Sequence, residues 1–348
     1  MQMGGFFLMM PMKKSFIAFA ALFVACNQSP QNAAIAEAEA VEEVVYLASW
    51  NDNPNKESII QFVSAVSTEG SPDFVPEGDR IAVFDNDGCL WAEKPFYFQL
   101  QFALDCAKEQ APSHPEWMDL PVMKAAAEGD LPTLMSFGEH GLLELVIRNH
   151  AGLTAEDFAD KVRNWIDTAK HPQTGLKYNE MVYQPMVEVL EYLRANGFKT
   201  FIVSGGGIDF MRPWVEEVYG IPSEQVIGSS IKATFELRDG KGMIVKQADL
   251  NFIDDKEGKP IGIHQHIGKR PIMAFGNSDG DLAMLQYATS GEGKRMAVFV
   301  HHTDSVREYA YDRKSSIGRL DKGLDEAIEK NWLLIDMAQD WKEIYPSK

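Results

Sequence analysis

The stretch IAVFDNDGCLW, residues 81–91, places two aspartates directly after a short apolar run. Residues 81–84 are apolar or small, and the polar residues and glycine that follow predict a buried strand ending in a tight turn. In a parallel sheet, ligands bind at the carboxyl ends of the strands. Asp85 and Asp87 therefore mark this strand end as a candidate functional site.

Apolar strands and amphipathic helices alternate along the second half of the chain. The predicted strands are FKTFIVS (198–204), QVIGSSI (225–231), RPIMAFGN (270–277) and RMAVFVHH (295–302). Strands that alternate with helices form a parallel sheet covered on both faces. The sequence therefore predicts the α/β class, with a three-layer α/β/α Rossmann-like core. Residues 231–258 contain Asp-Gly between alternating stretches and predict a β-hairpin or flap.

Helical patterns dominate residues 96–180, between the first predicted strand and the others. We interpret this segment as an all-helical cap domain inserted into the sheet domain. The predicted core domain then consists of residues 45–95 and 181–348.

The N-terminal segment has the features of a secretion signal. Lys13 and Lys14 precede an apolar run that ends with Ala25 and Cys26. A run of about ten apolar residues is too short to span a bilayer but fits the core of a signal peptide. A small residue directly before cysteine resembles a bacterial lipoprotein signal, in which the cysteine carries the lipid.

We therefore expect residues 1–26 to be a signal peptide with a lipobox and residues 27–44, which are polar and rich in alanine and glutamate, to be a linker. The expected location is the periplasm, after secretion across the inner membrane, with the protein anchored through Cys26. Asn27 after the cysteine favours the outer membrane. Ordinary secretion and a retained anchor are the alternatives.

Composition limits the classes of partner. The chain has 348 residues, 45% of them hydrophobic, and a formal net charge of −18. It is long enough for a large core, and its acidity opposes binding to nucleic acid. We therefore expect no nucleic-acid partner, and membrane contact only through the lipid anchor.

Asp85 and Asp87 suit phosphoryl chemistry. Two carboxylates this close repel each other unless a divalent cation lies between them or one of them is protonated. Mg²⁺ suits the first arrangement, because it takes one or two carboxylates and keeps several waters. One carboxylate can attack phosphorus while the other exchanges protons with the leaving group and water. Two solvated aspartates in a turn are the alternative.

Two further strand ends carry polar motifs. Ser204 is followed by three glycines, whose backbone N–H groups can approach an anion at the start of a helix. Asn277, Asp279 and Asp281 crowd after another strand and indicate a metal or phosphate site. A phosphoryl site also needs a cation, for which Lys259 and Lys269 are the candidates.

The order of these motifs resembles the four motifs of the haloacid dehalogenase superfamily: a strand with DNDG, a strand with SGGG, a lysine, and a strand with GNSDGD. Within the superfamily, the chain is similar to the phosphoserine-phosphatase-like branch. The resemblance covers roughly residues 78–345, and the helical segment matches the cap of that branch.

The resemblance implies a role for each motif. It makes Asp85 the nucleophile and Asp87 the general acid and base, and it makes Ser204, Gly205 and Lys259 the phosphate-binding residues. Lys269 is the alternative candidate for the role of Lys259.

For the metal, the resemblance implies Mg²⁺ held by Asp85, Asp87, Asn277 and Asp281, with Asp87 contributing its backbone carbonyl. Asn277 departs from the pattern, because many relatives have aspartate there. Asp279 is the candidate to replace it.

The second aspartate points to phosphate monoesters, since dehalogenases of the superfamily generally lack it. We therefore expect a Mg²⁺-dependent phosphatase that works through an aspartyl-phosphate. A phosphotransferase with the same site and a non-catalytic envelope lipoprotein that keeps the fold as a binding module are the alternatives. Glu93 and Arg212 are further candidates for contact with the substrate.

Overall fold

A computed structural model of the protein describes residues 46–347. The predictions for the signal peptide, the linker and Cys26 lie outside these residues. Within the described part of the chain, no helix is both long enough and apolar enough to cross a membrane.

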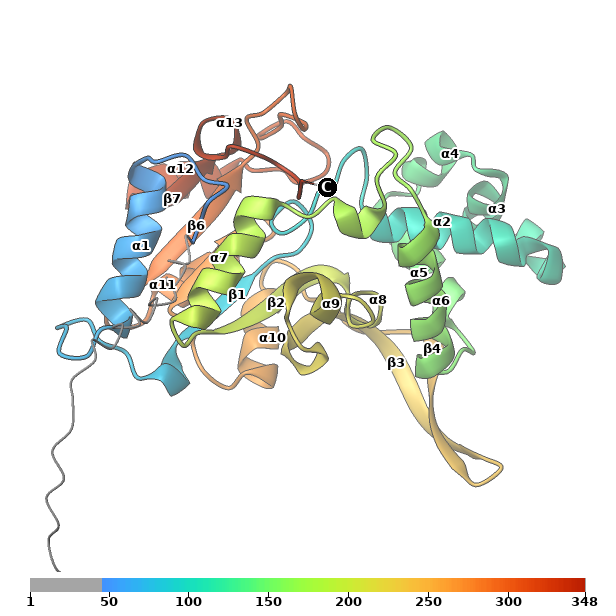
Figure 1. Ribbon diagram of the computed structural model, residues 1–348. Coiled ribbons are helices and arrows are strands. Elements are labelled where there is room, and N and C mark those ends of the chain that lie inside the picture. Colours follow the sequence, from blue (N-terminus) through green and yellow to red (C-terminus); the bar gives the residue numbers. More distant parts are fainter. Residues whose placement is uncertain (1–45, 348) are drawn as a thin grey trace, which may run out of the picture. The chain divides into compact units, whose positions relative to one another are not determined.

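The core is a seven-stranded sheet with the order β4-β3-β2-β1-β5-β6-β7 (Figure 1). Every neighbouring pair is parallel except the antiparallel hairpin of β3 and β4. β1 lies at the centre, where the strand order reverses, and this is the place where open α/β sheets bind ligands. The strands are β1 Ile81–Phe84, β2 Lys199–Gly207, β3 Val226–Arg238, β4 Lys241–Phe252, β5 Met273–Gly276, β6 Met296–His301 and β7 Leu333–Asp336.

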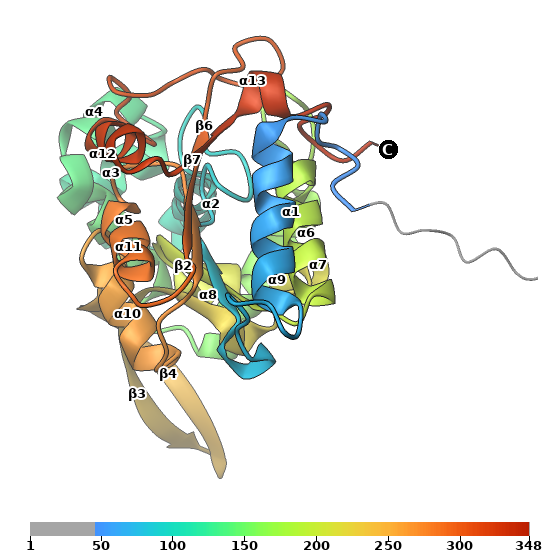
Figure 2. The same cartoon turned by 90° about the vertical axis from the view of Figure 1, so that its left-hand side faces the viewer.

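Helices cover both faces of the sheet, so the predicted three-layer α/β/α fold is confirmed (Figures 1 and 2). Side chains alternate along β1: Ala82 and Phe84 belong to one apolar cluster, and Ile81 and Val83 belong to the other. The first face is covered by α1 (Pro54–Ser67), α7 (Gln184–Ala195) and α9 (Val215–Tyr219), and the second by α10 (Gly258–His266), α11 (Leu282–Thr289) and α12 (Lys322–Lys330).

Between β2 and β3, the chain forms two short helices, α8 (Ile208–Met211) and α9, because Pro213 lacks the backbone N–H that a continuous helix needs. The edge strand β7 was not predicted. The hairpin expected within residues 231–258 is confirmed by β3 and β4.

Helices also fill the segment between β1 and α7. They are α2 (Phe98–Gln110), α3 (Pro121–Glu128), α4 (Leu131–Ser136), α5 (Gly138–His150) and α6 (Ala155–Thr168). α2 to α5 share their own apolar cluster, which includes Leu104, Met123 and Leu145. The hairpin is attached to this segment, because Gly152 N donates to Lys246 O and Lys246 N donates to Leu153 O, each at 2.9 Å.

Short helices complete the described chain. They are α13 (Met337–Asp340) and the 3₁₀ helices η1 (Glu77–Asp79), η2 (Ala111–Ser113), η3 (Pro115–Asp119), η4 (Tyr178–Glu180) and η5 (Ser223–Gln225).

Candidate active site

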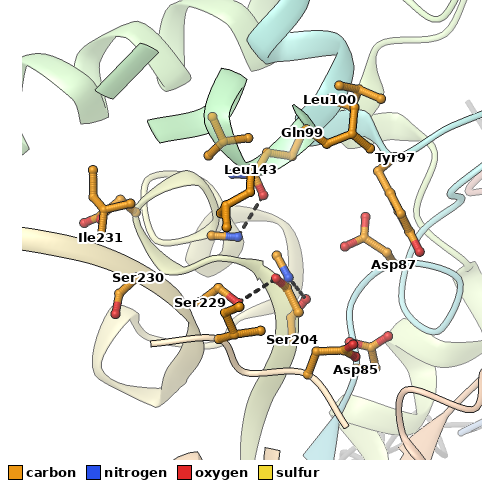
Figure 3. Close-up of a pocket in the computed structure, with 18 of the residues that line it drawn as sticks. Asp85, Asp87, Tyr97, Gln99, Leu100, Leu143, Ser204, Ser229, Ser230 and Ile231 are labelled. Atoms are coloured by element: carbon orange, nitrogen blue, oxygen red, sulfur yellow. Dashed lines mark hydrogen bonds between the residues drawn. The ribbon is translucent and has the colours of Figure 1, made fainter. Parts of the chain in front are cut away.

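A cavity of about 350 Å³ lies at the carboxyl ends of β1 and β2, and residues of α2, α5 and the β3–β4 hairpin close its other side (Figure 3). Most of the predicted site residues line this cavity, namely Asp85, Asp87, Ser204, Gly205, Lys259 and Asp281. The fold therefore gathers residues that are up to about two hundred positions apart in the sequence at one edge of the sheet.

Lys259 is fully buried and forms two ion pairs. Its Nζ lies 2.7 Å from Asp85 Oδ1 and 2.5 Å from Asp281 Oδ1, and it also donates to Val203 O at 2.9 Å. Burial alone would lower the pKa of Lys259, but the two carboxylates outweigh it and raise the pKa. The lysine therefore stays charged beside Asp85.

Lys269, the other candidate lysine, does not line the cavity. Its exposed Nζ donates to Gly78 O and pairs with Asp79 Oδ1 at 2.7 Å. Of the two candidate lysines, only Lys259 reaches the cavity.

The two aspartates have different surroundings. Burial and the charge of Asp281 raise the pKa of Asp85, and the Lys259 ammonium acts against both. Asp87 has no cation in contact; Trp91 Nε1 donates to its Oδ1 at 2.9 Å, and burial raises the pKa of Asp87 to about 6. Asp85 thus has a partner that favours its charged form, whereas Asp87 can hold a proton up to about pH 6.

The Ser204 side chain is held in place by the backbone that follows it. Gly206 N donates to Ser204 Oγ at 3.0 Å, which leaves the hydroxyl proton for another acceptor. Gly207 N donates to Gln99 Oε1 at 2.8 Å, so a residue of α2 fixes the glycine loop.

The last motif uses its two aspartates differently. Asp281 Oδ2 accepts from the backbone N–H groups of Asn277 at 2.9 Å and Ser278 at 3.0 Å and so shapes this loop. Asp279 Oδ1 accepts from Asp321 N and Gly323 N at the start of α12. Asp279 therefore caps a helix, and the structure does not support it as a substitute for Asn277.

Asn277 is joined to Glu93, which is buried. Asn277 Nδ2 donates to Glu93 Oε1 at 3.0 Å, and the Tyr311 hydroxyl donates to the same oxygen at 2.6 Å. Burial raises the pKa of Glu93 well above its usual value. The chain passes close to this pair at Gly88, where φ is +77° and any side chain would collide with Asn277 and Glu93.

The oxygen atoms present fit a magnesium ion. Asn277 Oδ1 is buried and has no hydrogen-bond partner in the described chain, and the buried carboxylate of Asp85 supplies a second hard donor. No group of three or more His, Cys, Asp or Glu side chains within residues 46–347 forms a ready metal site. Mg²⁺ does not need one, since it binds one or two carboxylates and keeps its waters.

Sequence reasoning missed several residues of the site. Tyr97 and Gln99 line the cavity, and His302 Nε2 donates to Gly88 O at 2.7 Å and so holds the aspartate loop. The available signal was a histidine at the carboxyl end of a predicted strand, since His302 is the last residue of the strand predicted over 295–302. Arg212 was proposed to contact substrate, but its guanidinium donates to Ser223 O and Val226 O, away from the cavity.

Comparison with known proteins supports this reading of the fold. A family profile described as haloacid dehalogenase-like hydrolase matches residues 82–286. No curated protein gives a significant match. A conserved protein of unknown function from Anaerococcus prevotii is similar in structure, with 16% identity, a TM-score of 0.50, and coverage of 80% of this chain and 90% of that one.

Two more solved structures share 16% identity with the chain. A protein of unknown function from Bordetella pertussis has a TM-score of 0.45 and covers 74% of this chain and 98% of its own. A probable phosphoserine phosphatase from Vibrio cholerae has a TM-score of 0.35 and covers 70% of this chain and 65% of its own.

Proposed function

The chain belongs to the haloacid dehalogenase-like hydrolase family, and from this premise we propose that it is a Mg²⁺-dependent phosphatase of small phosphate monoesters. One observation carries the proposal: Asp85 and Asp87 line the same cavity, but only Asp85 is paired with a buried lysine. A nucleophile and a proton donor need this difference in surroundings.

The first step is attack by an Asp85 oxygen on phosphorus, in which the new O–P bond replaces the bond to the leaving oxygen. Asp87, with a pKa near 6, gives its proton to that oxygen, and the alcohol departs. The product is an acyl phosphate on Asp85. Asp87, now ionised, takes a proton from a water whose oxygen attacks the phosphorus. The bond between the Asp85 oxygen and phosphorus breaks, so phosphate is released with Asp85 ionised and Asp87 protonated, as at the start.

Other residues bind the phosphoryl oxygens. The Ser204 hydroxyl and the backbone of Gly205 donate to them, and Lys259 neutralises the charge that develops there. Asp85, the Asp87 carbonyl and Asn277 Oδ1 would hold Mg²⁺, which when bound stabilises negative charge on the transferring group. Asp281 was predicted as a further ligand; since both its oxygens accept hydrogen bonds, we propose that it mainly positions Lys259 and Asn277.

We also propose that the enzyme works in the periplasm, attached to the outer membrane through Cys26. The basis is the lysine-led apolar run that ends in Ala25 and Cys26. Metabolic labelling with a fatty-acid probe tests this: wild-type protein should be labelled and Cys26→Ser should not. Label on the serine variant would contradict it.

Hydrolysis of an aryl phosphate by the purified protein tests the catalytic proposal. We expect release of phosphate that requires Mg²⁺, stops with a chelator, and falls by more than about 10³-fold in Asp85→Asn. Asp79→Asn is the matched control, because Asp79 is exposed and outside the cavity. If the folded protein releases phosphate from no monoester, the binding-module alternative replaces this proposal.

A further inference from the structure

The cavity has a second part, which the reaction described above does not use. Opposite the aspartates, aliphatic side chains from several elements meet and form what we call the apolar wall (Figure 3). It consists of Leu100 of α2, Leu142, Leu143 and Val146 of α5, Ile231 of β3 and Leu250 of β4. Because the wall and Asp85 line the same cavity, the leaving group of a phosphoryl group bound at Asp85 can lie against this wall.

The charged side chains beside the wall already have partners. Asp209 Oδ2 pairs with Lys246 Nζ at 2.5 Å, and Lys246 is buried. Each charge therefore satisfies the other, and neither is left to bind a charged substrate group.

The remaining polar groups are also engaged or uncharged. His150 Nδ1 donates to Val146 O at 2.5 Å, and burial lowers the pKa of His150 to about 4, so the ring is neutral. Gln99 Oε1 accepts from Gly207 N. Two further acids of the cavity lie on the catalytic side: Glu93 accepts from Asn277 and Tyr311, and Asp255 packs near Gly205 and Gly280 and lies 3.7 Å from Lys256 Nζ.

This lining would recognise a charged leaving group poorly. A carboxylate would need a free cation and an ammonium would need a free anion, and transfer of either into an apolar site without a partner is unfavourable. An aliphatic or aromatic group carries no charge that needs a partner, and its transfer from water into an apolar site is favourable.

We propose that the natural substrates are phosphate monoesters of uncharged, apolar alcohols or phenols, rather than phosphoamino acids. The inference rests on the proposed function, since it assumes that the phosphoryl group binds at Asp85. A cavity of about 350 Å³ is at the small end of the range for ligand sites, roughly 300–1,000 Å³, so the group held by the wall is small.

A chain-length series tests the proposal. We would measure kcat/KM of the full-length enzyme with Mg²⁺ for ethyl, butyl and hexyl phosphate and for O-phosphoserine. Each buried methylene should raise kcat/KM by about fourfold, the equivalent of about 0.8 kcal/mol, until the cavity is filled. Phosphoserine should fall at least tenfold below butyl phosphate. Equal values along the series, or a preference for phosphoserine, would overturn the proposal.

Binding without turnover separates this inference from the proposed function. The affinities of ethyl-, butyl- and hexylphosphonic acid, measured by calorimetry with Mg²⁺, should rise with chain length whether or not any ester is hydrolysed. Rising affinity without hydrolysis would keep the wall as a ligand site and reject the phosphatase. Hydrolysis of the esters with equal affinities for the three phosphonic acids would keep the phosphatase and reject the wall as a ligand site.

A pair of variants on one helix locates the effect. Leu143→Asn should reduce the ratio of kcat/KM for hexyl over ethyl phosphate by at least fivefold. Ile147→Asn is the matched control, because Ile147 is a partly exposed residue of α5 outside the cavity, and it should keep the wild-type ratio. Poor folding would lower both rates together and leave the ratio intact, so a ratio unchanged in Leu143→Asn contradicts the proposal.

Discussion

The two sides of the cavity differ in their side chains and in the segments that supply them. The catalytic side comes from the ends of parallel strands and the start of α10, and its charges are held by ion pairs such as Lys259 with Asp85 and Asp281. The apolar wall comes from inserted helices and a hairpin and carries no unpaired charge among the described residues that line it. The comparison points to a division of labour, in which the strand ends perform the reaction and the insertions select the leaving group.

The largest effects should follow from changes on the catalytic side. Lys259→Met leaves Asp85 and Asp281 buried without a cation, which we expect to lower the free energy of unfolding by about 3–5 kcal/mol. Activity should fall by more than about 10³-fold. Urea denaturation and steady-state kinetics measure the two losses.

The stability deficit of Lys259→Met should depend on pH. Without the ammonium, burial still raises the pKa of Asp85 above that of the unfolded chain, so the folded state takes up a proton as the pH falls. The deficit should therefore shrink between pH 7 and pH 5. Lys269→Met is the control and should change stability by no more than about 1 kcal/mol, because the Lys269–Asp79 pair is exposed. Equal losses in the two variants would contradict the central role of Lys259.

Asp87→Asn should have the next largest effect. Loss of the proton donor should lower kcat/KM for alkyl phosphates by about 10²–10⁴-fold, and by less for aryl phosphates, whose leaving groups need less protonation. In the wild type, kcat/KM should fall as the pH rises through about 6, because Asp87 must be protonated to act as the acid. A pH–rate profile measures this decline, which should be absent in the variant. A decline that persists in Asp87→Asn would assign it to another group.

The same substitution should stabilise the metal-free protein. The folded pKa of Asp87, about 6, lies above its ordinary value of 3.8, so the wild type loses stability as the pH rises from about 4 to 6. The amide of the Asp87→Asn variant avoids this loss and keeps an acceptor for Trp91. Because Asp87 is only partly buried and water screens its charge, we expect a gain of about 1–2 kcal/mol at pH 7.5 and none at pH 4, measured by urea denaturation without Mg²⁺.

The catalytic side could be predicted from sequence because its chemistry is local. Each motif follows an apolar strand, and parallel strands bring their carboxyl ends to one edge, so Asp85, Ser204 and Asn277 could be grouped without coordinates. The choice between Lys259 and Lys269 could not be made in this way, because both lie between the motifs in the sequence. It depends on the start of α10 facing the end of β1.

The apolar wall could not be predicted for a different reason. Leucines on an amphipathic helix give the same sequence pattern whether they face a core or a cavity. In α5, Leu145 is buried in the core of these helices, Leu143 lines the cavity, and Leu142 and Val146 do both, since they pack against that core and also line the cavity. Only the packing of α5 against α2 and the hairpin decides which of these side chains reach the cavity.

The smallest effect we predict is the coupling between the two sides. Asp87 acts on the leaving oxygen as the bond breaks, whereas Leu143 contacts the leaving group equally before and during the reaction, so their contributions to kcat/KM should be independent. For hexyl phosphate, the loss in Asp87→Asn/Leu143→Asn should equal the product of the single losses to within about twofold, a coupling energy below about 0.5 kcal/mol. A coupling of tenfold or more would mean that the wall aligns the leaving oxygen with Asp87. Selection of the substrate and proton transfer would then be one function of the cavity rather than two.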